Sequence, residues 1–235
     1  EGRRWSDGLH QAIEAKERRD EALLRASDAL RWHIEQRSVA VVGLREKERP
    51  LLGTGTCIRV GERYFVATAA HVIHDSLTAK LALAYALHPK TGHLPVSRFN
   101  FRGGDGESVD IGWIELEPEE AQQTGKEFVP VRRLRPGCHH LENQQTHTFG
   151  FPWDLRTESL HGETLHMGYQ PITHISRTLE PACWPETGNQ DVDLYLHYSR
   201  TGLTRSSGEP TDFVKPHGMS GGGIWVGFMH DQGIW

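Results

Sequence analysis

From residue 38 to the end of the chain, apolar residues fall into short runs that are separated by Gly, Pro and polar turns. The run at 38–44, Ser-Val-Ala-Val-Val-Gly-Leu, is rich in β-branched residues, as strands usually are. Many short strands divided by turns are typical of an all-β sandwich or barrel. The same pattern predicts further strands at 53–58, 64–72, 81–87, 94–99, 109–116, 128–134, 146–151, 172–179, 192–199 and directly after Ser220.

The N-terminal stretch differs, because its apolar positions recur at helical spacing. Two apolar stripes, at 5–13 and 23–34, flank the almost wholly charged stretch 14–21. The lack of Gly and Pro in this part favours one long helix, and two helices with a break near Asp20 are the alternative. We expect residues 1–37 to be a helical appendage whose first stripe binds a protein partner, the alternative being that both stripes pack on the rest of the chain.

Composition and charge exclude several classes of function. The chain has 235 residues, 37% of them hydrophobic and 24% charged, as in soluble globular proteins. Neither a membrane-spanning apolar run nor an apolar signal segment is present in the sequence. A formal net charge of −5 argues against nucleic acid as the main partner, and the basic stretch 132–135 is expected to be a solvated loop. We therefore expect neither a membrane nor a nucleic-acid partner.

Three stretches carry candidate chemistry. Ser220 lies in the turn Gly-Met-Ser-Gly-Gly-Gly at 218–223, which could present a reactive hydroxyl or could simply be a Gly-rich turn before a strand. The apolar run 64–72 carries His71 near its end, and the run 109–116 has Asp110 at its start. A nucleophilic serine needs a base, and the base needs an acid that fixes its tautomer. The three stretches supply one candidate for each role.

Together these stretches point to a family. Thr-Ala-Ala-His at 68–71, Asp-Ile-Gly at 110–112 and Gly-Met-Ser-Gly-Gly at 218–222 resemble the three signature motifs of trypsin/chymotrypsin-like serine proteases. Their order along the chain, His then Asp then Ser, is also that of the family. The resemblance spans residues 38 to 235.

The resemblance implies a mainly β fold of two six-stranded antiparallel barrels, preceded here by the N-terminal helix. The first barrel would cover 38–120 and carry His71 and Asp110, and the second would cover 121–235 and carry Ser220. The resemblance also implies a catalytic triad of these three residues, with the backbone N–H groups of Gly218 and Ser220 as the oxyanion hole. It implies neither a cofactor nor a metal.

Other residues compete for the roles of acid and base, and a metal centre is an alternative kind of site. Asp105 lies in Gly-Gly-Asp-Gly and is better explained as a turn residue than as the acid, and His74 lacks the motif around His71. A metal centre is disfavoured because Cys-x-x-Cys and His-Glu-x-x-His are missing, and because His161 and His166 share neither a helix face nor a strand face. The remaining histidines that raise this alternative are His139, His140, His174 and His197.

The chain departs from the family pattern at the pocket and at its end. Val214, with Lys215 beside it, occupies the place of the acid that gives trypsin its preference for basic residues, so we expect a small or apolar residue before the cut, unless Asp212 reaches the pocket. Met219 cannot form the ion pair that follows N-terminal clipping, so we do not expect zymogen activation. The sequence ends at Trp235, before the further strand that the family needs, so the second barrel is either truncated or completed in another way.

Cysteine usage and the motifs lead to a functional hypothesis. The three cysteines are far apart in sequence, and Val72 stands where secreted animal members carry a cysteine, so we expect a disulfide-free, cytoplasmic protein, although one bridge is conceivable. We expect a serine endopeptidase of bacterial type that cleaves protein or peptide substrates by acyl transfer, either regulated inside the cell or as the protease part of a larger assembly. The alternative is a catalytically silent protease fold that binds other proteins.

Overall fold

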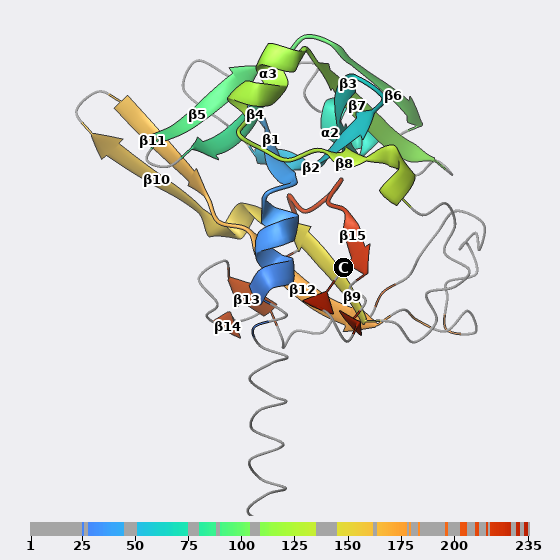
Figure 1. Ribbon diagram of the computed structural model, residues 1–235. Coiled ribbons are helices and arrows are strands. Elements are labelled where there is room, and N and C mark those ends of the chain that lie inside the picture. Colours follow the sequence, from blue (N-terminus) through green and yellow to red (C-terminus); the bar gives the residue numbers. More distant parts are fainter. Residues whose placement is uncertain are drawn as a thin grey trace, which may run out of the picture.

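The computed structural model describes residues 25, 28–44, 51–74, 80–87, 90–103, 109–134, 145–161, 164–177, 179, 183, 196, 203–205, 210–211, 215, 217–226, 229–230 and 233–234. Strands dominate these residues, and helices are few and short (Figure 1). A helix at 28–35 precedes the first strand. The predicted mainly β, antiparallel fold with an N-terminal helix is therefore confirmed.

The first half of the chain forms a single sheet of eight strands, with the order β5-β4-β1-β2-β3-β7-β6 and β8 added beside β2. All pairs are antiparallel except β2–β8, which is parallel. The strands are β1 (Ser38–Leu44), β2 (Leu51–Val60), β3 (Arg63–Thr68), β4 (Lys80–Leu87), β5 (Lys90–Pro95), β6 (Phe99–Gly103), β7 (Asp110–Leu116) and β8 (Val129–Pro130).

The second half forms a five-stranded antiparallel sheet in the order β14-β13-β12-β9-β15. Its strands are β9 (Gln145–Gly150), β12 (Ile172–Arg177), β13 (Leu203–Arg205), β14 (Pro210–Thr211) and β15 (Ile224–Val226). Two hairpins pair separately, β10 (Arg156–His161) with β11 (Thr164–Tyr169) and β16 (Met229–His230) with β17 (Gly233–Ile234). In Figure 1 the β10–β11 hairpin projects to one side next to β5, and the ring centroids of Tyr169 on β11 and His93 on β5 lie 6.3 Å apart. Within the described residues the two sheets thus have eight and five strands.

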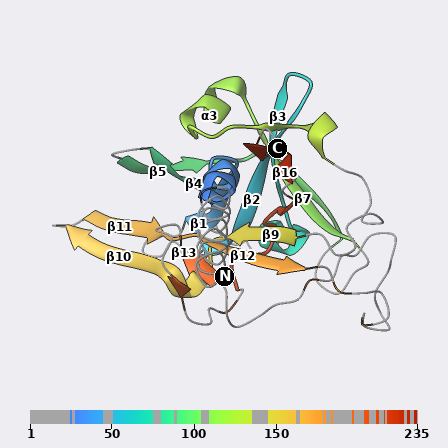
Figure 2. The same ribbon diagram turned by 60° about the horizontal axis from the view of Figure 1, so that its bottom comes forward.

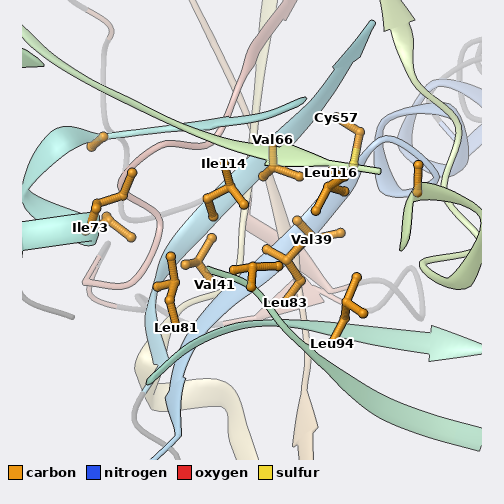
Figure 3. Packing of buried hydrophobic residues seen from close by; sticks show 14 residues of the cluster. Val39, Val41, Cys57, Val66, Ile73, Leu81, Leu83, Leu94, Ile114 and Leu116 are labelled. Atoms are coloured by element: carbon orange, nitrogen blue, oxygen red, sulfur yellow. The ribbon is translucent and has the colours of Figure 1, made fainter. Parts of the chain in front are cut away.

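The first sheet curls around its own apolar core. Leu94 on β5 and Leu116 on β7 belong to the same buried cluster, although these strands lie far apart in the order of the sheet (Figure 3). We call this cluster the first core; it consists of Val39, Val41, Cys57, Val66, Ala69, Val72, Ile73, Leu81, Leu83, Leu94, Val96, Ile114, Leu116 and Ala121.

A second core lies between the two sheets. It consists of Ile34, Ala40, Val42, Ala82, Phe149 and Phe151. On β1, Val39 and Val41 therefore face the first core, whereas Ala40 and Val42 face the second. Because β1 is buried on both faces, its sequence is a nearly continuous apolar run and not an alternating one.

The helix at 28–35 contributes to the second core. Ile34 is fully buried and Leu30 packs against the cluster, whereas 59% of the surface of Trp32 is exposed. The helix lies between strands of the two sheets in Figure 1 and in the turned view of Figure 2. The described part of the second predicted stripe therefore packs on the sheets. The stripe at 5–13 lies outside the described residues, so the appendage at 1–37 stays a prediction.

Cations close the C-terminal end of this helix. Arg37 Nη1 donates to the carbonyl of His33 at 2.6 Å, and Lys126 Nζ donates to that of Glu35 at 2.9 Å. Both satisfy carbonyls that have no partner within the helix, and both complement its dipole. Arg37 also pairs with Glu127, so the helix end is joined to the segment between the sheets.

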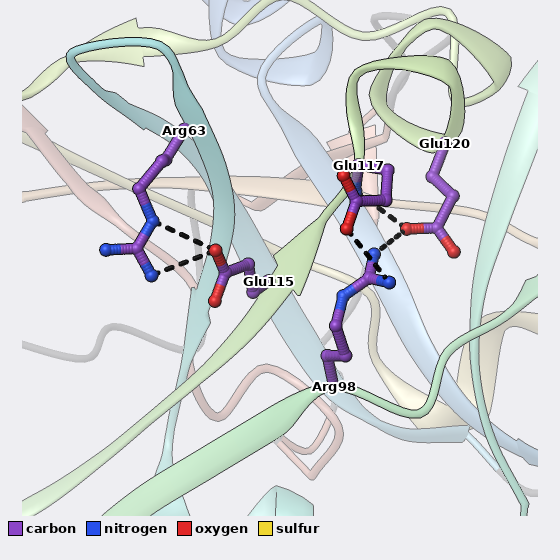
Figure 4. Close-up of polar contacts among 5 residues, drawn as sticks. All are labelled: Arg63, Arg98, Glu115, Glu117 and Glu120. Atoms are coloured by element: carbon purple, nitrogen blue, oxygen red, sulfur yellow. Dashed lines mark hydrogen bonds and ion pairs between the residues drawn. The ribbon is translucent and has the colours of Figure 1, made fainter.

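That segment also differs from the prediction of a polar crossing followed by a strand at 128–134. It contains helix α3 (Pro118–Gln123). Arg98 forms ion pairs with both Glu117 and Glu120 and thereby stabilises the first turn of this helix (Figure 4). The strand prediction was too long. Pro130 has no N–H to donate, so pairing ends there and a 3₁₀ turn, Val131–Arg133, follows.

None of the helices in the described part of the chain is long and apolar enough to cross a membrane.

Two of the three cysteines lie in the described residues. Cys57 and Cys183 are free thiols, and Cys138 lies outside the described residues. Complete burial raises the pKa of Cys57 to about 12, so this thiol stays protonated and belongs to the first core.

Candidate active site

His71 and Asp110 are in direct contact. His71 lies in the short helix α2 (Ala70–His74), which begins just after β3 ends, so the predicted strand at 64–72 is divided into a strand and a helix. Asp110 is the first residue of β7. His71 Nδ1 lies 2.6 Å from Asp110 Oδ2, and the backbone N–H of His71 donates to Asp110 Oδ1 at 3.0 Å. Both carboxylate oxygens therefore hold the same residue and fix its ring.

The sequence brings these two residues together through the glycine of Asp-Ile-Gly. A Cβ at Gly112 would lie 2.6 Å from Ile73 Cδ1 and 3.2 Å from the Ala69 carbonyl oxygen. Glycine therefore lets α2 lie directly on β7, which sets His71 against Asp110. Asp105, the competing acid, lies outside the described residues.

The turn that carries Ser220 packs against the first sheet. The backbone N–H of Thr54 donates to the Ser220 carbonyl at 2.8 Å. Gly221 has a φ of 83°, and a Cβ there would lie 2.3 Å from Thr68 Oγ1 and 2.7 Å from the Ala69 nitrogen. Only glycine fits this position, for both backbone and steric reasons. The serine turn therefore touches the segment that leads into His71, and the three candidate residues come from adjoining segments.

The hydrogen bonds of Ser220 and of the N–H groups beside it complete the description of the site. Among the described residues, no hydrogen bond joins Ser220 Oγ to the His71 ring, and the N–H groups of Gly218 and Ser220 have no acceptor. Gly218 is buried, where an unpaired N–H is unusual. Nucleophile–base contacts are often long in unliganded enzymes and tighten on binding. An oxyanion hole needs N–H donors beside the serine that have no acceptor, and within the described residues Gly218 and Ser220 meet this condition.

Met219 anchors the turn from the opposite side. Its side chain is 7% exposed and packs with Ile172 and Leu155 against the second sheet. A Cβ at Gly150 would lie within 3.0 Å of three Met219 atoms, so Gly150 makes room for this contact. Apolar packing therefore stabilises the turn on the side of the second sheet.

The predicted pocket residues lie at the margin of the described chain. Val214 and Asp212 fall outside it, and Lys215 is exposed. His217, directly before the turn, stacks on Trp153 with ring centroids 6.0 Å apart. Arg156 covers the Trp153 ring, its Cζ lying 3.9 Å from the ring centroid. The residue directly before the serine turn is thus part of an aromatic and cationic stack.

The histidines that raised a metal centre do not form one in the described part of the chain, where no group of three or more His, Cys, Asp or Glu could hold an ion. His174 is buried in β12, and burial lowers its pKa. His161 and His166 lie on paired strands but are not register partners. His139, His140 and His197 lie outside the described residues, and His74 is exposed on α2 with its ring against Phe101.

Two threonines at the site were missed by sequence reasoning. Thr54 was assigned only to a strand, and Thr68 was named only as the first residue of Thr-Ala-Ala-His. The structure shows that the Thr54 hydroxyl donates to the Gly218 carbonyl and that the Thr68 hydroxyl donates to the Thr54 carbonyl. The available signal was the Gly-Thr-Gly-Thr pattern at 53–56, because glycines beside a threonine permit another backbone to approach closely.

Comparisons with known proteins give weak likenesses only. No protein-family model matches the chain, and no curated protein matches its sequence. A thermostable serine protease from an extremophilic microorganism is 15% identical, with a TM-score of 0.44, over 83% of this chain and 80% of that chain. A scabies mite inactivated protease paralogue is 12% identical, with a TM-score of 0.40, over 63% of this chain and 60% of that chain. These likenesses do not establish a family or an activity.

Proposed function

We propose that the chain is a serine endopeptidase that cleaves protein or peptide substrates by acyl transfer. The observation that carries this proposal is the two-point contact between His71 and Asp110, beside a serine turn that packs against the segment leading into His71. A carboxylate that binds both the ring and the backbone of a histidine fixes the ring tautomer, as a general base needs.

Each residue then has a distinct role. His71 Nε2 takes the proton of Ser220 Oγ as the oxygen attacks the scissile carbonyl, while Asp110 Oδ2 accepts the Nδ1 hydrogen and stabilises the imidazolium. The N–H groups of Gly218 and Ser220 stabilise the oxyanion of the tetrahedral intermediate. His71 returns the proton to the leaving amine, and a water molecule then hydrolyses the acyl-enzyme.

Substrate preference follows from the residues around the turn. We propose that a small or apolar side chain precedes the cut, since Val214 replaces the acid that a basic side chain would need. Digestion of a peptide library tests this preference. A strong selection of Lys or Arg would contradict it and would point to Asp212 as the pocket acid.

The second candidate function is a catalytically silent protein-binding module. The observation that favours it is the missing hydrogen bond between Ser220 and His71 in the described residues. Such a protein would keep the fold but would not activate its serine.

Labelling by a fluorophosphonate, which reacts with activated serines, separates the two functions. We expect one adduct on the wild-type chain, mapped to Ser220 by mass spectrometry, and none on Ser220→Ala or His71→Ala. Equal labelling of Ser220→Ala would refute the assignment of the nucleophile. A folded wild-type chain that neither reacts nor cleaves any peptide would support the silent module.

A further inference from the structure

We propose that the Thr54 hydroxyl is a positioning residue that holds the serine turn in its reactive geometry. The inference rests on the proposed function, because it concerns how Ser220 and the N–H donors beside it are set. It concerns a first-sheet residue that the triad motifs do not include.

Thr54 uses all of its polar groups at the junction of the two sheets. Its Oγ1 donates to the Gly218 carbonyl at 2.9 Å and accepts the Phe151 N–H at 3.0 Å. Its N–H donates to the Ser220 carbonyl at 2.8 Å, and its carbonyl accepts the Thr68 hydroxyl at 2.8 Å. The residue is fully buried, so water cannot replace a lost bond without rearrangement.

These contacts fix the backbone on both sides of the nucleophile. The Gly218 and Ser220 carbonyls belong to the two peptide planes that flank the Met219–Ser220 peptide. Because a peptide is planar, fixing a carbonyl also fixes the N–H of the same plane and limits rotation of the next one. The Met219–Ser220 peptide carries the Ser220 N–H, one of the two proposed oxyanion donors. Thr54 thus constrains the direction of that donor.

Gly218 makes the constraint necessary. Its φ of 91° lies in a region that glycine adopts readily, and a glycine can rotate to many other conformations at little steric cost. The bond from Thr54 Oγ1 to the Gly218 carbonyl opposes rotation of the next peptide plane. Without the hydroxyl, the turn would sample orientations in which its donors no longer converge on the oxyanion.

The alternative is that Thr54 only joins the two sheets through Phe151. The chain offers a matched control for this alternative in Thr124, which is also fully buried. Its hydroxyl likewise donates to one carbonyl, that of Ala121 at 2.7 Å, and accepts one N–H, that of Lys126 at 3.2 Å. Thr124 lies at the end of α3, outside the site. Thr54→Val and Thr124→Val therefore delete the same pair of bonds in a buried setting.

The experiment measures fluorophosphonate labelling of the full chain for wild type, Thr54→Val, Thr54→Ser and Thr124→Val. Each variant gives a maximal labelling rate, a half-saturating concentration and a melting temperature. We expect Thr54→Val to lower the maximal rate about 10–100-fold, as a misaligned donor does, with the half-saturating concentration within about twofold. Thr54→Ser keeps the hydroxyl and should recover the rate to within about threefold. Thr124→Val should lower the melting temperature but not the rate.

Several outcomes would overturn the inference. A wild-type maximal rate in Thr54→Val, equal rate losses in Thr54→Val and Thr124→Val, or a failure of Thr54→Ser to recover the rate would each do so. If Thr54→Val does not fold, Thr54→Ala, which removes the hydroxyl without adding a methyl group, carries the same expectation. A wild-type chain without labelling would refute the proposed function and this inference with it. Labelling that is lost in Ser220→Ala but unchanged in Thr54→Val would refute this inference alone.

Discussion

The base–acid pair and the serine turn are built in different ways. His71 lies on α2 and Asp110 on the first-sheet strand β7, and both elements contribute to the first core. The serine turn belongs to the second sheet, yet its carbonyls are held by Thr54 of the first. The geometry of the pair therefore depends only on the first sheet, whereas the geometry of the turn depends on the packing of the two sheets against each other. Changes within the first sheet and changes between the sheets should accordingly have different effects.

The largest effect should come from breaking the pair itself. Asp110→Asn removes the carboxylate that holds the His71 ring, and we expect a loss of about 10⁴-fold in peptidase rate, the size known for this change in a Ser-His-Asp triad. The melting temperature should change little, because both side chains are about a third exposed, 30% for His71 and 31% for Asp110. His74→Ala, on the same helix, is the control and should keep the wild-type rate. A full rate in Asp110→Asn would remove Asp110 from the triad.

The next largest effect should come from the core between the sheets. Ile34 is fully buried there, so Ile34→Ala should lower the free energy of unfolding by about 2–5 kcal/mol. Trp32→Ala, on the exposed side of the helix, should stay within about 0.5 kcal/mol. Denaturant unfolding measures both. If Ile34→Ala were as stable as Trp32→Ala, the helix would not be part of this core.

A smaller effect isolates the contact between the turn and the first sheet. Gly221→Ala places a Cβ against Thr68 and Ala69 and strains a φ of 83°, so we expect a loss of about 1–3 kcal/mol together with lost labelling. Gly61→Ala is matched in backbone, with a φ of 59°, but its Cβ meets nothing within 4 Å. The stability difference between the variants measures the steric contact. Equal losses would mean that the turn does not press on the first sheet.

The smallest effect concerns pH. Burial lowers the pKa of His147 and His174 in the second sheet below the ordinary value of 6.5. The unfolded chain then binds more protons than the folded chain below about pH 6.5, so the free energy of unfolding should fall as the pH falls through this region. His147→Leu should flatten that slope in urea titrations at several pH values. An unchanged slope would show that His147 does not contribute to it.

The sequence predicted the parts of this architecture that follow from local pattern. β1, β4 and β7 coincide closely with predicted apolar runs, because a buried strand appears in the sequence as a continuous run of apolar residues. The β10–β11 hairpin was missed, since Arg-Thr-Glu-Ser-Leu-His at 156–161 contains no such run. The division of 64–72 into β3 and α2 was also missed, because short apolar runs do not separate strand from helix.

The candidate site shows the same limit. His71, Asp110 and Ser220 were proposed from three motifs; the structure brings His71 and Asp110 into contact, and their roles stay a prediction. Thr54 could not be proposed in this way, because its partners Phe151 and Gly218 are distant in sequence and meet it only when the sheets dock. Pairwise contacts between sheets leave no periodic trace in the sequence of either sheet.

We propose that Ser220 is a nucleophile that His71 activates and two backbone donors assist. A crystal structure of the chain after reaction with a fluorophosphonate would test this role. We expect phosphorus bonded to Ser220 Oγ, with one phosphoryl oxygen about 2.7–3.1 Å from the nitrogens of both Gly218 and Ser220. We also expect His71 to keep its bond to Asp110 and to turn Nε2 toward the adduct. An adduct on another residue, or a phosphoryl oxygen directed away from both nitrogens, would contradict it.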